Sequence, residues 1–298
     1  MKKPKVIVIL GPNASGKSSL GIKLAKKYNG EIISADSRQI YKGLDLGTGK
    51  VTKEEMNGIK HHLLDILNPG ETFSAFDFQK KAYVAIDDII SRNKTPFIVG
   101  GTGLYIRSIT EGYNLEENSI DMEYRKYLEE KSLTDLVGEL NKHNIDVNID
   151  KQNKRRVIRA LEKIKIGDNL KQKKYQPKYD CLELGMSWPK EIQNQRINDR
   201  AEERVKKGMI EEVEALRNSG VTDEFLDKIG LDYRYTLCYL TNKFKTKEEY
   251  IEELKRADRK YGKRQMTWFK KDKNVIWLDV NNNYLEEAEF LINKFLNK

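Results

Sequence analysis

Apolar runs of strand length alternate with helical patterns over the first third of the chain. The run VIVIL at 6–10 leads into a glycine-rich turn and then a helical pattern, which is typical of a buried parallel strand that feeds a helix. A second run, EIISA at 31–35, ends just before Asp36, and a third, FIV at 97–99, ends at a glycine cluster. Strands that alternate with helices predict an α/β fold, with a mostly parallel sheet flanked by helices.

The remaining elements of this core are predicted from caps and shorter runs. Ser74 and Asp77 have the spacing of a capping box at the start of a helix. Charged helical patterns dominate from Pro189, which suits a helix start, to Trp268. The run NVIWLDV at 274–280 predicts a last strand.

Strand-like runs disappear between residues 115 and 180, where apolar residues fall at helical spacing instead. Ser132 is predicted to cap one of the helices of this segment, and the run CLELG at 181–185 then restores a strand. We therefore predict a small all-helical domain, residues 115–180, inserted into an α/β core formed by 1–114 and 181–298.

Residues 11–18, GPNASGKS, complete the pattern G-x-x-x-x-G-K-S between a predicted strand and a predicted helix, the context that this motif requires. Glycines let backbone N–H groups surround a phosphate chain, Lys17 adds a cation, and Ser18 can ligate Mg²⁺. A plain tight turn is the alternative, which the complete pattern disfavours. Arg196 and Arg200 share a helix face, where they could pair with acids or reach the same diphosphate. The sequence predicts a site for a polyphosphate or diphosphate.

Asp36 follows the second predicted strand, and in a doubly wound sheet this position lies on the same rim as the phosphate loop. Its carboxylate could act as a general base or help to hold a metal, whereas a turn or cap role is an equal alternative on this residue alone. Kinases and ATPases with such loops usually have a further strand that ends in Asp. Here the strand at 97–99 ends in a GGTG turn that contains Thr102 and could admit a substrate closely.

Charge is unevenly distributed along the 298 residues, of which 34% are charged with a net charge of +9. The segments 151–178 and 255–273 carry +9 and +7, which leaves −7 for the rest. Solvated helix faces are one interpretation, and polyanion binding is the other. The second would use interleaved aromatic residues for stacking, namely Tyr175, Tyr179, Tyr261 and Trp268. We expect the two basic segments to face each other across an RNA-sized groove, with the phosphate loop at its floor.

Other residue patterns exclude several classes of protein. No apolar run approaches the roughly 18 residues that a membrane span needs, and none suits a signal peptide, so we expect a cytoplasmic protein without membrane association. Cys181 and Cys238 lack metal-ligand spacing and are interpreted as free thiols. His61 and His62 have no partner at zinc spacing, so we interpret them as loop or strand-end residues.

Seven blocks of sequence resemble one known family, the tRNA dimethylallyltransferases, also called tRNA isopentenyl-diphosphate transferases. In order they are GPNASGKS, SADSRQIYKGLDLGTGK, HHLLDIL, VGGTGLYI, RRVIRALE, QRINDR and KRQMTWF. They span nearly the whole chain, whereas ordinary kinases with this loop share only the first block.

The resemblance implies a P-loop NTPase-like core with an inserted helical domain that clamps RNA. It implies transfer of a dimethylallyl group from its diphosphate to N6 of adenosine 37, beside the anticodon, in tRNAs that read codons beginning with U. The implied co-substrate is dimethylallyl diphosphate, the cofactor Mg²⁺, and the partner the tRNA anticodon stem-loop. We expect the enzyme to be a monomer.

The resemblance also implies roles for individual residues. Asp36 would take the proton from the adenine amine and is a second candidate metal ligand beside Ser18. Thr102 would line the substrate channel and Arg200 would bind the diphosphate, so that Asp36, Lys17, Thr102 and Arg200 form the catalytic set. The diphosphate cradle would be Gly11, Pro12, Asn13, Ala14, Ser15, Gly16, Lys17 and Ser18. The tRNA contacts would be Asp36, Ser37, Arg38, Gln39, Thr102, Arg155, Arg156, Arg159, Arg264 and Gln265.

The sequence departs from the family pattern at two places. Asn13 stands where Thr is usual, which keeps a hydrogen-bonding side chain but no hydroxyl. Where many members read A-I-G-Y-K/R, this chain reads KIGLDYRYT at 228–236, and no role is carried over from that block. Two other classes remain open on the residues alone: a small-molecule kinase, from the phosphate loop, and a non-catalytic, nucleotide-regulated RNA-binding protein, from the basic segments.

Overall fold

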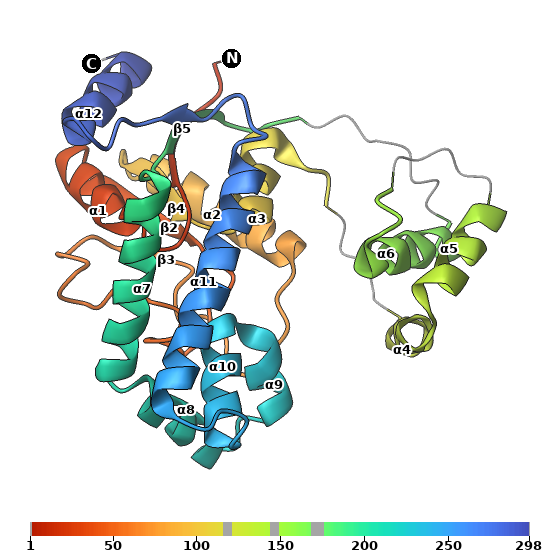
Figure 1. Ribbon diagram of the computed structural model, residues 1–298. Helices are drawn as coiled ribbons and strands as arrows, with labels where there is room; N and C mark the ends of the chain where they lie inside the picture. Colours follow the sequence, from red (N-terminus) through yellow and green to blue (C-terminus); the bar gives the residue numbers. More distant parts are fainter. Residues whose placement is uncertain (1, 116–120, 144–148, 168–175, 298) are drawn as a thin grey trace. The chain divides into compact units, whose positions relative to one another are not determined.

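The computed structural model describes residues 2–115, 121–143, 149–167 and 176–297 (Figure 1). Contacts between Cα atoms divide the chain into two compact units. The core unit comprises the chain up to Tyr113 and from Gln176 onward, and the insertion unit comprises the residues between them. No helix in the described ranges is long and apolar enough to cross a membrane.

A six-stranded parallel sheet forms the centre of the core unit, in the order β3-β2-β4-β1-β5-β6. Its strands are β1 (Lys5–Leu10), β2 (Gly30–Ala35), β3 (His61–His62), β4 (Thr95–Gly100), β5 (Asp180–Gly185) and β6 (Ile276–Trp277). Leu10 pairs with Gly100 and Gly185, and Gly100 also pairs with Ala35, so the four long strands end level with one another. The loops after these strands therefore meet at one edge of the sheet, as the α/β pattern predicts.

Helices cover both faces of the sheet, and every side chain from Val6 to Leu10 is therefore buried. Val6 and Val8 pack in a cluster with α2 (Ala75–Ser91) and α3 (Gly103–Arg107). Ile7 and Ile9 pack in the opposite cluster with α1 (Lys17–Lys27) and α12 (Tyr284–Leu296). This confirms the prediction, made from the continuous apolar run, of a strand that is buried on both faces. A short π-helix, η1 (Ser108–Gly112), continues α3.

The remaining helices of the core unit extend beyond the carboxyl edge of the sheet. They are α7 (Lys190–Lys206), α8 (Met209–Asn218), α9 (Asp223–Ile229), α10 (Leu231–Leu240) and α11 (Lys247–Phe269). The long helices α7 and α11 lie side by side (Figure 1). Ile40 and Leu44, from the segment after β2, are buried against Met209 of α8 and Tyr233 of α10. This packing fixes the segment after Asp36 over the edge of the sheet.

The insertion unit contains the helices α4 (Met122–Glu130), α5 (Leu133–Lys142) and α6 (Lys154–Lys165), which share a small core that includes Leu128, Leu136 and Leu161. Ser132 caps α5 by accepting a hydrogen bond from the backbone N–H of Asp135, as predicted. The unit ends before residue 180, because β5 begins at Asp180 and Tyr179, only 2% exposed, packs in the core of the other unit.

Several local predictions agree with the structure. Ser74 and Asp77 form the predicted capping box of α2. Cys181 and Cys238 are free. His61 and His62 form the edge strand β3, and His62 Nε2 lies 2.8 Å from Glu31 Oε2.

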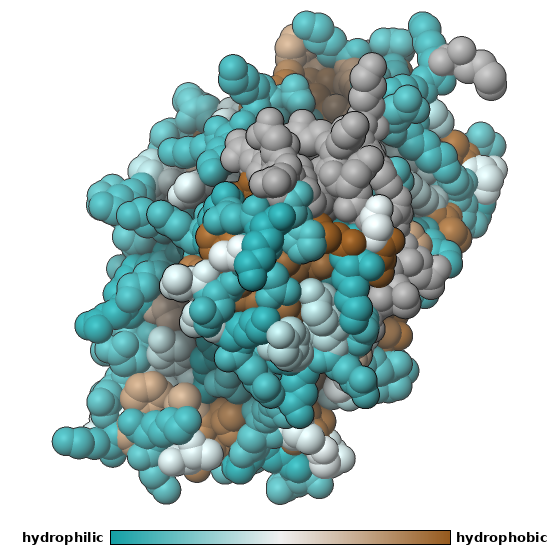
Figure 2. All heavy atoms as spheres, turned by 90° about the vertical axis from the view of Figure 1, so that its right-hand side faces the viewer, coloured by the Kyte–Doolittle hydropathy of each residue, from teal (hydrophilic) through white to brown (hydrophobic). Residues whose placement is uncertain are grey.

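Among the residues that the structure describes, no cluster of three His, Cys, Asp or Glu side chains could hold a metal ion. Hydrophilic residues cover most of the face in Figure 2, consistent with the high charged fraction.

Candidate active site at the carboxyl edge of the sheet

Asp36 and Thr102 follow neighbouring strands, and hydrogen bonds join their two turns. The backbone N–H of Thr102 donates to the carbonyl of Ala35 at 3.1 Å. The backbone N–H of Ser37 donates in turn to Thr102 Oγ1 at 3.1 Å. The Asp36 carboxylate accepts a hydrogen bond from the backbone N–H of Arg38 at 2.9 Å. The structure therefore brings these two predicted catalytic residues together at one rim.

The phosphate loop has the backbone conformation that its motif requires. Ala14 and Gly16 adopt positive φ angles of 57° and 95°, and α1 begins directly afterwards at Lys17. The first N–H groups of this helix face the loop, which favours an anion at this position. Lys17 Nζ donates to the carbonyl of Pro12 at 3.1 Å. Ser15 is buried, and its hydroxyl has no hydrogen-bond partner in the described ranges.

Two side chains from α7 hold the outer peptide groups of the loop. Gln193 Nε2 donates to the carbonyl of Asn13 at 2.7 Å, and Arg196 Nε donates to the carbonyl of Ala14 at 2.9 Å. The Arg196 guanidinium also stacks on Trp188 at 4.7 Å from the ring centroid. Arg196, one of two arginines that could reach a diphosphate, is thus a support of the loop.

Gln265 of α11 connects the phosphate loop to the GGTG turn. Its carboxamide accepts a hydrogen bond from the backbone N–H of Asn13 at 2.8 Å and donates one to the carbonyl of Gly101 at 3.0 Å. The side chain is buried. Both ends of its amide are thus hydrogen-bonded inside the protein, and contact of Gln265 with tRNA stays a prediction.

Asn13 packs closely on the same helix. Its Oδ1 would lie 2.7 Å from a Cβ atom at Gly262, so only glycine fits there without a shift. Its Nδ2 lies 3.5 Å from the carbonyl of Asp258. Asn13, which departs from the family pattern, therefore faces α11.

A cavity of about 550 Å³ opens beside the phosphate loop. Its walls come from the loop and α1, from the segment 45–57 and from α7. Three acidic residues line it, Asp45, Glu55 and Glu203. The lining contains twice as many basic side chains, namely Lys17, Lys23, Lys50, Arg200, Arg204 and Lys207. Its size and charge suit a small polyanion.

The cationic groups of this cavity perturb one another. Burial, followed by the charge of Arg200, lowers the pKa of Lys17 to about 8, although Asp36 opposes the shift. Burial, followed by the charge of Arg204, lowers the pKa of Arg200 to about 10. Crowded positive charges disfavour one another in the absence of an anion, so a bound diphosphate would relieve the repulsion. Arg200 also donates to the carbonyl of Gly49 at 3.1 Å.

The remaining predicted tRNA contacts fall into two groups. Arg38 and Arg264 are exposed on the core unit, and Arg155 and Arg156 are exposed on α6. Two other side chains have partners within the protein. Gln39 donates to the carbonyls of Thr48 and Gly49. Arg159 pairs with Glu162 at 3.2 Å.

The aromatic residues of the basic segments also differ in availability. Tyr179 is buried and donates to Asp87 at 2.8 Å, so it cannot stack on RNA, contrary to prediction. Trp268 lies against Gly103, where a Cβ would be 2.9 Å from its Nε1. Tyr261 is 36% exposed, whereas Tyr175 lies outside the described residues. The groove between segments 151–178 and 255–273 stays a prediction, because the first segment crosses from one unit into the other.

Sequence reasoning missed residues that support the site from the helices beyond the sheet. Glu212 of α8 accepts a hydrogen bond from the backbone N–H of Leu46 at 2.8 Å and another from the Tyr233 hydroxyl at 2.7 Å. Arg204 of α7 pairs with Asp232 of α10 at 2.7 Å. Neither Glu212 nor Arg204 belongs to a local sequence motif. The signal that could have found them is a charged residue on a helix face that is otherwise apolar.

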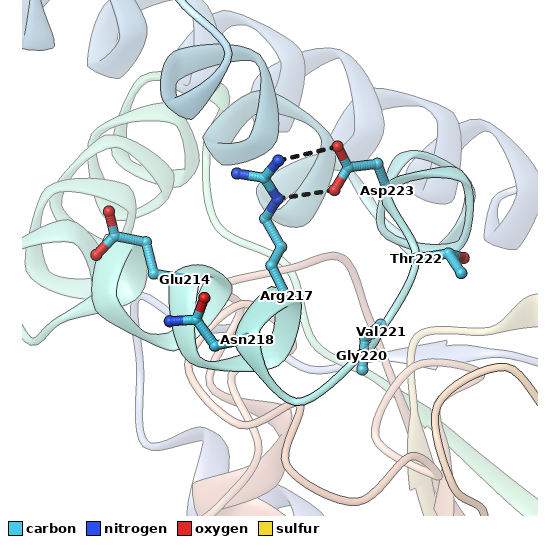
Figure 3. A pocket seen from close by; sticks show the side chains of 7 residues that line it. All are labelled: Glu214, Arg217, Asn218, Gly220, Val221, Thr222 and Asp223. Carbon is cyan, nitrogen blue, oxygen red and sulfur yellow. Dashed lines mark hydrogen bonds and ion pairs between the residues drawn. The ribbon is translucent and has the colours of Figure 1, made fainter.

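A second hollow, of about 580 Å³, lies at the turn between α8 and α9 (Figure 3). Arg217 is its only basic lining residue, and two hydrogen bonds to the Asp223 carboxylate engage its guanidinium. Glu214 adds a further negative charge. This hollow therefore lacks the excess of cations that a diphosphate needs.

A parallel sheet that presents a glycine-rich phosphate loop and a helix N-terminus at its carboxyl edge defines a P-loop protein of NTPase-like fold. Within that class, residues 39–272 match the family model described as IPP transferase. The chain is 42% identical over 292 residues to the tRNA dimethylallyltransferase of Bacillus anthracis, covering 94% of this chain and 92% of the relative. It is 39% identical to that of Oceanobacillus iheyensis, covering 98% and 96%.

Solved structures give the same result. The tRNA isopentenylpyrophosphate transferase of Bacillus halodurans matches with a TM-score of 0.75 and 37% identity, covering 99% of this chain and 98% of that one. A eukaryotic dimethylallyltransferase acting on tRNA matches with a TM-score of 0.82 and 28% identity, covering 99% and 80%. The chain belongs to the tRNA dimethylallyltransferase family, enzymes named for transfer of a dimethylallyl group to tRNA.

Proposed function

We propose that this enzyme transfers a dimethylallyl group from dimethylallyl diphosphate to N6 of adenosine 37 in tRNAs that read codons beginning with U, giving N6-isopentenyladenosine. One observation carries this proposal: the turn that holds Asp36 is tied to Thr102 at the same edge of the sheet as the phosphate loop. A proton acceptor and a diphosphate cradle are the two groups that the reaction needs at one place.

The chemistry requires help at both ends of the transfer. The exocyclic amine of adenine is a poor nucleophile, so it must be positioned against the allylic carbon and lose its proton. In the proposed reaction the N6–C bond forms and the allylic C–O bond breaks. The electron pair of the broken bond leaves with the diphosphate, and Asp36 accepts the N6 proton. Lys17, Arg200 and the loop N–H groups stabilise the leaving group.

Mg²⁺ fits the donors that this edge provides. The Ser18 side chain is half-buried in the lining of the cavity, and half-buried Asp36 follows β2, from which β4 separates the strand before the phosphate loop. Mg²⁺ is usually held by one or two carboxylates together with substrate phosphates and water, so a cluster of three protein acids is not needed. Ser18, with Asp36 as second candidate, would hold the ion, which neutralises charge on the departing diphosphate when bound.

The tRNA would be bound through exposed cations and the rim of the site. Ser37, Arg38 and Thr102 lie beside Asp36, and Arg264 is exposed on α11. Arg155, Arg156 and Arg159 would contact the anticodon stem-loop from α6, which we propose as the RNA-binding helix of the insertion unit. The target base would have to leave the anticodon-loop stack to reach Asp36, at a cost of a few kcal/mol. We further propose a monomeric, cytoplasmic enzyme.

The test uses two anticodon stem-loops that differ only at position 37. The enzyme is incubated with dimethylallyl diphosphate, Mg²⁺ and a stem-loop bearing A37 or G37, and the nucleosides are separated and weighed after digestion. Isopentenyladenosine from the A37 substrate alone supports the proposal. No product from A37, or equal product from other adenosines in the G37 stem-loop, contradicts it. Replacing the donor with ATP tests the kinase alternative, which predicts phosphorylated product.

A further inference from the structure

Two arginines of α7 flank a single glycine beside the phosphate loop. Arg200 and Arg204 lie one helical turn apart, and a Cβ at Gly49 would overlap the Nη2 atoms of both guanidinium groups. Gly49 has a φ of +59°, so glycine is favoured there for conformation as well as for space. Both arginines line the cavity that also contains Lys17. The backbone of the segment 45–57 is thus shaped around a pair of cations.

Arg204 is only partly satisfied by the protein. Its Nη1 donates to Asp232 Oδ1 at 2.7 Å, with both side chains about one-tenth exposed. Its Nε is buried and has no hydrogen-bond partner among the residues that the structure describes. A guanidinium carries five N–H donors in a fixed plane, and buried donors are normally bonded. Arg204 therefore has donor capacity to spare on a side chain that lines the cavity.

Acids behind the cavity do not balance its positive charge. Asp232 of α10 and Asp258 of α11 are both buried and face the two arginines. Burial, followed by the charge of Asp232, raises the pKa of Asp258 well above its usual range, so that carboxyl tends to keep its proton. The three cations Lys17, Arg200 and Arg204 are then opposed mainly by two carboxylates, Asp232 beside the arginines and Asp36 beside Lys17 and Arg200. An anion that enters the cavity meets an unbalanced, water-poor cluster of cations.

Asp232 lies in the block at 228–236, which departs from the family pattern. When KIGLDYRYT is aligned with A-I-G-Y-K/R on Ile229 and Gly230, Asp232 occupies the place of the Lys or Arg. This chain therefore has an acid where the family pattern has a Lys or Arg. That acid faces Arg204, which comes from another helix.

We propose that Arg204, anchored by Asp232, is a second arginine that binds the diphosphate of the prenyl donor and its product. This inference rests on the proposed function, because it assigns the diphosphate to the cavity beside Lys17. Arg204 binds through its N–H donors, while Asp232 is a positioning residue that fixes the guanidinium plane.

The probe is inorganic diphosphate with Mg²⁺, titrated calorimetrically into the intact enzyme. Removal of Arg204 alone would leave Asp232 buried without its partner, so the informative variant is the double change Arg204→Met with Asp232→Asn. Charge-assisted hydrogen bonds contribute about 1.5–3 kcal/mol, so we expect roughly 10- to 100-fold weaker binding of diphosphate. The KM for dimethylallyl diphosphate should rise with it, while the affinity for tRNA stays unchanged.

Two further variants separate binding from positioning. Asp232→Asn alone keeps the cation but loosens its anchor, so we expect a smaller loss of diphosphate affinity than in the double variant. Arg204→Lys with native Asp232 keeps the charge and should recover part of the affinity. A matched control is the double change Arg217→Met with Asp223→Asn, which removes a bidentate pair outside the cavity (Figure 3). It should leave diphosphate binding at the wild-type level.

The outcomes distinguish failure of this inference from failure of the proposed function. If wild-type enzyme and Lys17→Met bind diphosphate equally, or neither binds it, the proposed diphosphate site is wrong. If wild-type enzyme binds, Lys17→Met does not, and the folded Arg204→Met/Asp232→Asn variant binds like wild type, only the role of Arg204 is wrong. Thermal unfolding of each variant shows that the comparison is made on folded protein.

Discussion

The backbone N–H of Ser37 donates a hydrogen bond to the hydroxyl of Thr102 across 3.1 Å. With the bond from the Thr102 N–H to the carbonyl of Ala35, it closes a small ring that spans the turn containing Asp36. The general base we propose is therefore held by the neighbouring strand as well as by its own. We therefore propose for Thr102 a positioning role that does not depend on direct contact with substrate.

We expect Thr102→Val to slow prenyl transfer by about 10- to 100-fold, because misplacing a catalytic group by a fraction of an ångström is costly. The change keeps the volume of the side chain but removes the acceptor for Ser37. Single-turnover transfer at saturating donor and tRNA measures the effect. The control is Thr102→Ser, which retains the hydroxyl and should transfer at close to the wild-type rate. Equal rates for the Val and Ser variants would show that the bond does not position Asp36.

Gln265→Leu should destabilise the enzyme, because it leaves the Asn13 N–H and the Gly101 carbonyl without their partner. Each buried polar group left unpaired costs about 1–3 kcal/mol. Urea unfolding measures the loss. The neighbouring Arg264→Leu is the matched control: this exposed residue should affect tRNA binding and leave stability unchanged. A Gln265→Leu variant of normal stability and weakened tRNA binding would show that Gln265 contacts tRNA, as the sequence predicts, and does not support the two turns.

Diphosphate affinity should fall as the pH rises through about 8, because Lys17 with its lowered pKa then loses the proton that makes it a cation. Binding of an anion favours the charged lysine, so binding is strongest below this pKa and takes up a proton near it. Calorimetric titrations between pH 6.5 and 9.5 measure this. Lys17→Arg remains charged throughout and should show a much smaller decline. Parallel curves for both enzymes would mean that Lys17 is not the titrating group.

Glu183→Gln should be more stable than the wild-type enzyme at pH 8, and this gain should be smaller at pH 4.5. Burial, followed by the charge of Asp272, raises the pKa of Glu183 from 4.5 to about 7. A raised folded-state pKa means that the native protein binds the proton more tightly, so stability is present below pH 4.5 and is lost as pH rises through 7. Replacing the carboxyl by an amide removes that loss, which amounts to about 1–3 kcal/mol for a shift of this size.

Urea unfolding at the two pH values tests this expectation, and Glu31→Gln provides a contrast. Hydrogen bonds from Arg92 and other cations outweigh the burial of Glu31 and lower its pKa, so its replacement should destabilise the enzyme at pH 8. A Glu183→Gln variant with the wild-type dependence of stability on pH would show that Glu183 does not carry the shift.

How much could be predicted depended on whether a residue belongs to a local pattern. The strand, loop and helix around Lys17 were predictable because burial on both faces gives an uninterrupted apolar run and the loop needs glycine at fixed places. The rim position of Asp36 followed from the topology of parallel sheets. Tyr179 was misinterpreted because a tyrosine among lysines looks the same whether it faces RNA or a core. Gln265 and Arg204 act through partners far away in sequence, which no local spacing reveals.

The most direct test of the account is the single-turnover rate of Asp36→Asn with dimethylallyl diphosphate, Mg²⁺ and an A37 stem-loop. The amide cannot accept the N6 proton but is nearly the same size, and its Oδ1 can still accept the Arg38 N–H bond. General-base catalysis contributes about 10²- to 10⁴-fold, so the rate should fall by that factor while stem-loop and diphosphate binding are retained. Isopentenyladenosine formed by Asp36→Asn at the wild-type rate would contradict the account.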